Sequence, residues 1–292
     1  MNTEGVCIVT AANSGIGKEV AAGLLERGQH VILACRNMGR CRAAQEELAE
    51  RRLPGISECA QLDVASYKSV RDFAGRVCTD AGQRGGRKVK VLINNAGIMG
   101  LPLTREGVDP HMHVNHYGPY LLMRLLLPAL APHARVVFVA SRAHEHGRLH
   151  VSKGRVQGMP PHWYLRYARS KLCNVLTAAE LQRRARAAGL ALTTASVSPG
   201  IVATNLWDNL PVFWRAPVRL LVRRFCLTPR QGAATVLYAA TEPGLERHGG
   251  RYWHACKEKR PSAYARDAHL AAKLWDASEA AVGLTKEEAA WP

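Results

Sequence analysis

Short apolar runs alternate with amphipathic segments along most of the 292-residue chain. The apolar runs have the length of strands, and the segments between them repeat apolar residues every three or four positions, as helices do. Strands are predicted near 6–10, 31–35, 57–62, 89–94, 135–140, 191–197 and 251–254. Helices are predicted near 15–27, 39–51, 66–78, 109–130, 163–186, 229–241 and 267–282. This alternation predicts an α/β fold, a single doubly wound Rossmann-type domain over 1–292 with a parallel sheet of about seven strands and helices on both faces.

The first predicted strand runs into a turn that contains glycine. The strand V-C-I-V-T is followed by A-A-N-S-G-I-G, from Ala11 to Gly17, and then by a helical pattern. A strand, a glycine turn and a helix together place a pyrophosphate at the helix N-terminus. Gly15 and Gly17 would let backbone N–H groups approach the phosphates without a Cβ between them. Taken alone, the segment is equally consistent with an ordinary βα turn.

The second predicted strand, V-I-L-A-C, ends at Arg36. In a dinucleotide fold this strand end reads the adenosine ribose, with a carboxylate for NAD or an arginine for the 2′-phosphate of NADP. Arg36 and Arg40 are candidate phosphate ligands, because a guanidinium matches phosphate geometry. The alternative is a solvated arginine after a strand. Since no acidic residue occupies the position, NADP(H) is the predicted cofactor.

Tyr167 and Lys171 stand four residues apart in Y-A-R-S-K, and Ser141 ends an earlier apolar run. A spacing of four places both side chains on one face of a helix. An ammonium beside a phenol favours the phenolate, so we expect the pKa of Tyr167 to fall from its usual value of about 10. Such a tyrosine could exchange a proton with an alcohol or carbonyl oxygen near neutral pH. A Tyr–Lys pair at this spacing is also common on amphipathic helices. The pair therefore indicates a catalytic role only together with the other motifs of the chain.

Together these segments resemble the short-chain dehydrogenase/reductase family over nearly the full length of the chain. The turn resembles T-G-x-x-x-G-x-G, and V-V-F-V-A-S and Y-A-R-S-K resemble the serine and Y-x-x-x-K motifs. The resemblance implies a catalytic set of Asn115, Ser141, Tyr167 and Lys171. In it, Tyr167 would transfer the proton, Lys171 would hold the nicotinamide ribose and lower the tyrosine's pKa, and Asn115 would support a relaying water.

The same resemblance implies the cofactor contacts. Asp63 in L-D-V looks like the acid that meets the adenine, N-N-A-G like the stretch beside the cofactor, and P-G-I-V-A-T like the segment that holds the nicotinamide amide. The implied contacts are Ala11, Asn13, Ser14, Gly15, Ile16, Gly17, Arg36, Asp63, Val64, Asn95, Ala96, Gly97, Tyr167, Lys171, Pro199, Gly200, Val202 and Thr204.

Within the family the retinol dehydrogenase branch looks most similar, on L-A-C-R, on G-G-R-Y-W-H-A-C-K-E-K-R-P and on L-W-D-A-S-E-A-A-V-G-L. This implies an NADP-dependent oxidoreductase that interconverts an apolar alcohol and its aldehyde or ketone. A carbonyl reductase for a steroid, lipid or xenobiotic is the alternative within the family. A dinucleotide-binding protein without turnover is the alternative from another class, although the intact catalytic set argues against it.

One residue departs from the family pattern, because Ala11 stands where the first glycine of the turn is expected. The added methyl would cost most if the residue needs a positive φ. Since Gly15 and Gly17 remain, we expect cofactor binding to be weakened and not lost.

The chain is strongly basic, with a net charge of +17 and a pI near 10.0. No nucleic-acid recognition motif accompanies the charge, so no nucleic-acid partner is predicted. Part of the charge lies in 205–228, within a predicted substrate lid near 201–228, where arginines alternate with tryptophans and leucines. That pattern is consistent with a lid that has a solvated basic face, or with peripheral membrane contact.

Eight scattered cysteines without a C-x-x-C pair are expected to be free thiols, which fits a reducing compartment. The twelve histidines show no metal-binding spacing. The apolar stretch Tyr120 to Leu130 is too short to span a membrane and contains Arg124 and Pro128, so it is expected to pack on the sheet or to form a homodimer face. With no secretory signal visible, an intracellular protein is expected, either cytoplasmic or peripherally membrane-associated.

Overall fold

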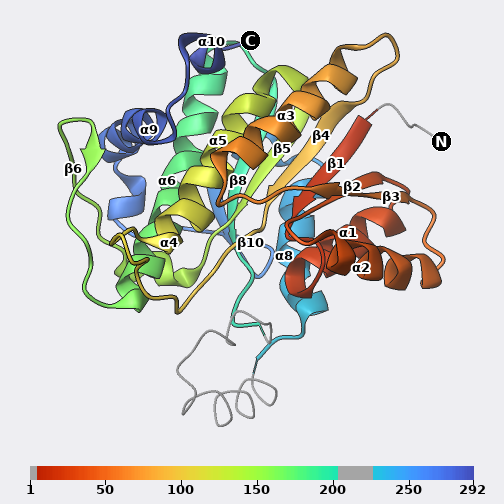
Figure 1. The fold of residues 1–292 in the computed structure, drawn as a ribbon, viewed down its shortest axis with the longest axis horizontal. Coiled ribbons are helices and arrows are strands. Elements are labelled where there is room, and N and C mark those ends of the chain that lie inside the picture. Colours follow the sequence, from red (N-terminus) through yellow and green to blue (C-terminus); the bar gives the residue numbers. More distant parts are fainter. Residues whose placement is uncertain (1–4, 203–225) are drawn as a thin grey trace.

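The computed structural model describes residues 5–202 and 226–292, and its centre is an eight-stranded sheet between two layers of helices (Figure 1). The strand order is β10-β9-β8-β5-β4-β1-β2-β3, with neighbours from β9 to β3 parallel. The strands are β1 (Gly5–Thr10), β2 (His30–Cys35), β3 (Ile56–Gln61), β4 (Lys88–Asn94), β5 (Leu130–Val139), β8 (Leu192–Ser198), β9 (Arg251–His254) and β10 (Lys257–Lys259). The doubly wound parallel sheet is confirmed. The eighth strand was missed because β10, Lys-Glu-Lys, contains no apolar residue and pairs antiparallel with β9.

The helices cover both faces of the sheet, as predicted (Figure 1). One layer holds α1 (Gly15–Glu26), α2 (Met38–Glu50) and α8 (Pro229–Thr241). The other holds α3 (Tyr67–Gly82), α5 (Gly118–Leu126) and α6 (Trp163–Ala187), with α9 (Ala268–Val282) packed on α5 and α6. Short elements complete the described chain, namely α4 (Pro110–Met112), α10 (Lys286–Ala289) and a hairpin of β6 (Val151–Ser152) and β7 (Arg155–Val156).

The strand β1 shows how the sheet separates two apolar cores. Val6 and Ile8 pack into the core beneath α3 and α5, whereas Cys7 and Val9 pack into the core beneath α1 and α8. Alternate side chains of a strand point to opposite faces, so a strand that is buried on both faces needs a continuous apolar run. This is why the central strands could be recognised from the sequence.

The helix predicted near 109–130 is not continuous. After α4 the chain makes one π-helical turn, His113–Tyr117, continues as α5, and ends in a 3₁₀ turn, Leu127–Ala129, before β5 begins at Leu130. Apolar periodicity cannot reveal a turn with one extra residue, because the side chains on both sides of it remain buried. The π turn contains Asn115, one of the predicted catalytic residues.

The apolar stretch within α5 is buried inside the chain. Leu121, Leu122 and Met123 are fully buried, and so is Arg124. Arg124 forms an ion pair with Glu279 of α9, and its guanidinium lies over the rings of Trp275 and Trp291. The stretch therefore packs on the sheet, which is the first of the two interpretations of the sequence. Among the described residues, no helix is both long and apolar enough to cross a membrane.

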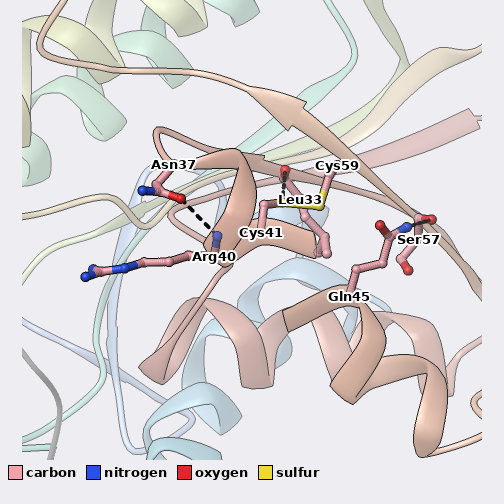
Figure 2. The surroundings of a disulfide bond; sticks show 7 residues. All are labelled: Leu33, Asn37, Arg40, Cys41, Gln45, Ser57 and Cys59. Atoms are coloured by element: carbon pink, nitrogen blue, oxygen red, sulfur yellow. Dashed lines mark hydrogen bonds between the residues drawn. A yellow bond between two sulfur atoms is a disulfide. The ribbon is translucent and has the colours of Figure 1, made fainter. Parts of the chain in front are cut away.

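The prediction that all cysteines are free was wrong for one pair. Cys41 of α2 and Cys59 of β3 form a disulfide, which Figure 2 shows beside Leu33 of β2. The two residues are 18 positions apart, but the crossover from β2 through α2 to β3 brings their Cα atoms to 6.0 Å. The other six cysteines are free. The argument for a reducing compartment is weakened by this pair, because such compartments disfavour disulfides.

Candidate active site

The predicted site residues gather at the carboxyl end of the sheet. Those that the structure describes follow β1, β2, β3, β4, β5 and β8 in turn, except for Asn115 in the π turn and two residues on α6. Because the carboxyl ends of parallel strands meet at one edge, segments far apart in the sequence become neighbours there. Ligands of open α/β sheets bind at that edge, so the fold itself indicates where a ligand would bind.

The glycine turn leaves room for an anion at the start of α1. Gly15 has a φ of +54°, and a Cβ on Gly17 would lie only 2.5 Å from the carbonyl oxygen of Ala11 and from Asn95 Nδ2. Ser14 is the N-cap, but its side chain makes no capping hydrogen bond, and the first turn of α1 contains no acidic residue. The first N–H groups of α1 are thus available to a phosphate, which the helix dipole also favours.

Ala11 lies in the left-handed region, with a φ of +54°. Its N–H donates to the carbonyl oxygen of Ala34 at 2.8 Å, and its own carbonyl lies against Gly17. The turn thus keeps the backbone that a glycine would adopt and places an alanine in it, which costs roughly 1–2 kcal/mol. The concern raised by the sequence, a methyl at a position of positive φ, is confirmed.

Thr10 is a polar residue of this region that the sequence analysis did not single out. Its hydroxyl accepts hydrogen bonds from the backbone N–H groups of Asn95 and Ala96, at 2.9 and 2.8 Å. The side chain of Asn95 donates to the Thr10 carbonyl at 2.9 Å. One buried threonine therefore fixes the N-N-A-G stretch against the glycine turn. Its only signal in the sequence is its place at the end of an apolar strand.

Residues at the ends of β2 and β3 form the outer part of the site. Arg36 and Arg40 are exposed, and neither side chain forms an ion pair or hydrogen bond with another residue of the described ranges. Asn37 accepts from the N–H of Arg40 at 2.9 Å and so starts α2 beside them (Figure 2). Asp63 is half-buried, and its carboxylate accepts from the N–H of Ala65 at 3.0 Å.

Asn115, Ser141, Tyr167 and Lys171 come from three different segments. Ser141 caps a 3₁₀ turn after β5 and accepts from the N–H of Ala143 at 3.2 Å. Tyr167 is buried in α6, and the side chain of Ser141 lies near enough to its phenol to offset part of the rise in pKa that burial causes. Lys171, one turn further along α6, donates from Nζ to the carbonyl oxygen of Val139 at 2.8 Å, and its Nζ lies 5.7 Å from the centre of the Tyr167 ring. The structure thus brings the serine, tyrosine and lysine together.

The π turn holds Asn115 in this group. Its Oδ1 accepts from the N–H of Ile98 at 2.7 Å, and its Nδ2 donates to the Ile98 carbonyl and to Ser170 Oγ, at 3.0 and 2.9 Å. Ser170 in turn donates to the carbonyl oxygen of Tyr167 at 2.7 Å. Asn115 therefore joins the chain after β4 to the helix of the tyrosine. Single-turn π-bulges recur at functional sites.

The ionisation of the tyrosine differs from the expectation. Burial raises the pKa of Tyr167 to about 12, against the lowering effect of the Ser141 side chain. Burial also lowers the pKa of Lys171 to about 8, because the ammonium loses its hydration. The expected fall in the tyrosine's pKa was wrong for this structure, since the desolvation of the phenol outweighs any charge beside it.

The segment after β8 contains the last of the predicted cofactor contacts. Pro199 and Gly200 are half-buried, Gly200 with a φ of +88°, and Val202 is buried and bridges to Leu227. The N–H of Leu227 donates to the carbonyl oxygen of Ile201 at 2.9 Å. Residues 201 and 227 are therefore neighbours, although they are far apart in the sequence. Thr204 and most of the predicted lid and membrane segment lie outside the described residues.

Two histidines accompany the Ser141 turn. His144 is buried and contacts the Ser141 carbonyl through Nδ1 at 2.8 Å, while its Nε2 accepts from the N–H of Ser262 at 3.3 Å. His146 is exposed and pairs with the hydroxyl of Tyr164 at 2.8 Å. Within residues 5–202 and 226–292, no cluster of three or more histidine, cysteine or acidic residues could hold a metal ion.

Comparison with known proteins identifies the family of this chain. The family model described as short chain dehydrogenase matches residues 5–212. The chain belongs to the short-chain dehydrogenase/reductase family. The chain is 37% identical to human retinol dehydrogenase 14, over 96% of this chain and 86% of that protein. It is 40% identical to human dehydrogenase/reductase SDR family member 13, over 98% of this chain and 75% of that protein.

A solved structure of an uncharacterised protein from Mycobacterium paratuberculosis superposes with a TM-score of 0.74 at 32% identity, over 99% of this chain and 96% of that one. The short-chain dehydrogenase/reductases are oxidoreductases that bind a nicotinamide dinucleotide, and the relatives include retinol dehydrogenases. The resemblance drawn from the motifs is confirmed at the level of the family and of its retinol dehydrogenase-like relatives.

Proposed function

We propose that this protein is an NADP-dependent oxidoreductase that interconverts an apolar alcohol and its aldehyde or ketone. The observation that carries the proposal is the buried group of Ser141, Tyr167 and Lys171, tied to Asn115, beside an open helix N-terminus. Each part has a role in moving a hydride and a proton, and the fold brings the parts to one edge of the sheet.

The residues present fit a nicotinamide dinucleotide. Gly15 and Gly17 provide a turn in which a Cβ would clash, and the first turn of α1 offers N–H groups without a competing acid. A Cβ on Gly97 would lie 3.3 Å from Lys171 Nζ, so the glycine keeps the approach to the lysine open. The dinucleotide would supply the hydride. The phosphate turn would be completed by Asn13, Ser14 and Ile16. The rest of the dinucleotide would be lined by Asp63, Val64, Asn95, Ala96 and the segment that begins at Pro199.

NADP is preferred over NAD because of the end of β2. Arg36 and Arg40 are exposed and without an acidic partner among the described residues, and no carboxylate occupies the end of β2, where a ribose hydroxyl would be bound. Two guanidinium groups beside the start of α2 suit a 2′-phosphate.

Tyr167 would hold the proton at its phenol oxygen. With a pKa raised to about 12, the phenol is protonated at neutral pH and is ready to donate to a carbonyl oxygen as hydride arrives at the carbon. Ser141 would hold the same oxygen, where negative charge grows. Lys171 would keep a cationic donor near this oxygen and, with a pKa lowered to about 8, could exchange protons close to physiological pH.

An apolar substrate is favoured by the surroundings of Tyr167. Met99 and Ala143 pack with it in one apolar cluster, and the rings of Trp163 and Tyr164 lie against that cluster. Apolar and aromatic walls with a few polar groups are usual for sites that bind apolar small molecules. This supports the broad substrate class, without choosing among retinoid, steroid and other carbonyl compounds.

The test is NADPH oxidation with all-trans-retinal, a steroid ketone and an aromatic aldehyde, for the wild type and for Tyr167→Phe. We expect turnover of at least one compound by the wild type and loss of turnover in the variant, with NADPH binding retained. If the variant keeps more than a tenth of wild-type kcat, the proton donor is another residue. NADPH binding without turnover of any compound would instead favour the non-catalytic alternative.

A further inference from the structure

A cavity of about 680 Å³ lies between α6, the N-terminal end of α9 and the β9–β10 hairpin. None of the candidate catalytic or cofactor residues lines it. Its volume is within the usual range for pockets that bind small molecules, roughly 300–1,000 Å³. The proposed function gives this cavity no role.

The rim of the cavity is rich in cationic side chains. They come from α6, from β9 and β10, and from the segment before α9, and they are Arg183, Arg251, Lys259, Arg260 and Arg266. Three acidic residues also line the cavity, namely Glu180, Glu258 and Asp267. Whether the rim attracts an anion depends on how far these acids neutralise the cations.

Each of the three acids is already engaged. Glu180 is buried and pairs with Arg183 and Arg184, both at 2.6 Å. Glu258 pairs with His248 at 3.0 Å and with Arg251 at 3.6 Å. The carboxylate of Asp267 caps α9 by accepting from a backbone N–H at 2.9 Å.

Among the residues that the structure describes, three cations of the rim have no partner. Lys259, Arg260 and Arg266 are exposed, and their side chains form no ion pair or hydrogen bond within the described ranges. They come from two segments on either side of the opening, so a single anionic group could meet more than one of them. Glu180 and Glu258 are neutralised by their cationic partners, and Asp267 offsets only part of the remaining charge, so an anion entering here would meet a net positive charge.

The apolar lining of the cavity, its floor, consists of the buried ring of Tyr252 and of small side chains. Val175 and Ala179 line it from α6, and Ala265 and Ala271 line it from the segment that leads into α9. Short side chains at these positions leave the volume open, whereas longer ones would fill it. A ligand that suits the whole cavity therefore has an anionic end for the rim and an apolar body for the floor.

We propose that this cavity binds an anionic amphiphile, a carboxylate or phosphate joined to an apolar chain, at a site separate from the candidate active site. The anionic group contacts Lys259, Arg260 and Arg266, and the chain lies along Ala179 and Ala271. A fatty acid and an alkyl phosphate share this chemistry, and a lipid headgroup in a bilayer would present only its anionic part.

The probe is dodecyl phosphate below its critical micelle concentration, measured by titration calorimetry on the full chain. The rim variant is Arg260→Glu with Arg266→Glu. The matched control is Arg52→Glu with Arg84→Glu, which changes the net charge equally at exposed positions that do not line the cavity. We expect the rim variant to weaken binding by at least about tenfold and the control to leave it nearly unchanged. Equal binding by the two variants would overturn the proposal.

A second variant tests the floor independently of charge. Ala179→Phe should weaken dodecyl phosphate and leave the weaker binding of inorganic phosphate unchanged, with far-UV circular dichroism and Tm used to confirm folding. Inorganic phosphate that binds as tightly as dodecyl phosphate would overturn the apolar part of the assignment. Binding to anionic phospholipid vesicles but not to monomeric dodecyl phosphate would show a membrane-binding surface in place of the proposed pocket.

Discussion

Replacing Ala11 by glycine should leave the stability of the protein nearly unchanged, although glycine is normally the costlier residue. Ala11 has a φ of +54°, in the left-handed region that favours glycine. An L-residue in that region costs roughly 1–2 kcal/mol. Its hydrogen bond from N–H to the Ala34 carbonyl uses only the backbone, so a glycine would keep it. Ala11→Gly therefore removes strain and loses no hydrogen bond.

The opposing effect lies in the unfolded chain. Glycine gains conformational freedom there, which lowers stability by about 0.4–1 kcal/mol. Ala11→Gly also loses a half-buried methyl that packs on the core, which costs about 0.4 kcal/mol. The three effects together leave the free energy of unfolding between about 0.5 kcal/mol lower and about 1 kcal/mol higher. For a chain of this size, 1 kcal/mol corresponds to a change in Tm of about 2 °C.

The neighbouring alanine is a matched control. Ala12 is fully buried and does not have a positive φ, so Ala12→Gly loses a buried methyl and gains only unfolded-state entropy. That variant should lose roughly 1.2–1.8 kcal/mol. Urea unfolding of both variants gives the comparison. If Ala11→Gly loses as much stability as Ala12→Gly, the turn stores no strain at residue 11 and the reasoning is refuted.

The same geometry revises the expectation of weakened cofactor binding. Because the backbone of Ala11 already has the conformation that a glycine would take, the strain is present in the folded chain whether or not a ligand binds. Ala11→Gly is therefore expected to change the NADPH dissociation constant by less than about threefold. A larger gain in affinity would mean that the methyl itself contacts the cofactor.

Three other outcomes follow. Arg36→Asp should shift the ratio of kcat/KM for NADPH over NADH towards NADH by about tenfold or more, because a charge-assisted contact is lost; an unchanged ratio would place Arg36 in solvent. Lys171→Met should abolish turnover yet raise the unfolding free energy at pH 7 by roughly 2 kcal/mol, because removing the desolvated charge gains about 3 kcal/mol and losing the hydrogen bond to Val139 costs about 1 kcal/mol. The lysine's pKa is lower in the folded chain, about 8, than in the unfolded one, 10.5, so the unfolded state binds more protons between these values. Wild-type stability should then rise relative to the variant across that pH window, and parallel pH curves would argue against a desolvated ammonium. Thiol titration of the unfolded, non-reduced protein should find six free cysteines and, after reduction, eight; eight without reduction would exclude the pair of Cys41 and Cys59.

The sequence was sufficient wherever one physical requirement dominates a segment. Strands buried on both faces must be apolar, so β1, β2 and β4 were predicted to within a residue or two. The Tyr167–Lys171 spacing placed both side chains on one helical face, and the structure brings Ser141 to them. The family was therefore recognisable from motifs alone.

The missed features depend on contacts between distant segments. β10 has no apolar residue and exists because β9 offers it a partner. The π turn at Asn115 depends on hydrogen bonds to Ile98 and Ser170, and the disulfide depends on how α2 lies beside β3. The direction of the tyrosine's pKa was missed for the same reason, because the local sequence shows the charge nearby but not the extent of burial.

The two edges of the sheet are closed in different ways, which affects how molecules of this protein behave at high concentration. An open edge strand invites pairing with a strand from another molecule, and charged side chains suppress such pairing. β10 ends one side of the sheet with three exposed charged residues. The opposite edge, β3, carries a single acidic residue and no basic one, and Cys59 attaches it to α2. Intermolecular strand pairing is therefore opposed by electrostatics at one edge, whereas at the other edge a covalent bond to α2 holds the strand in place, and a reducing agent would remove that restraint.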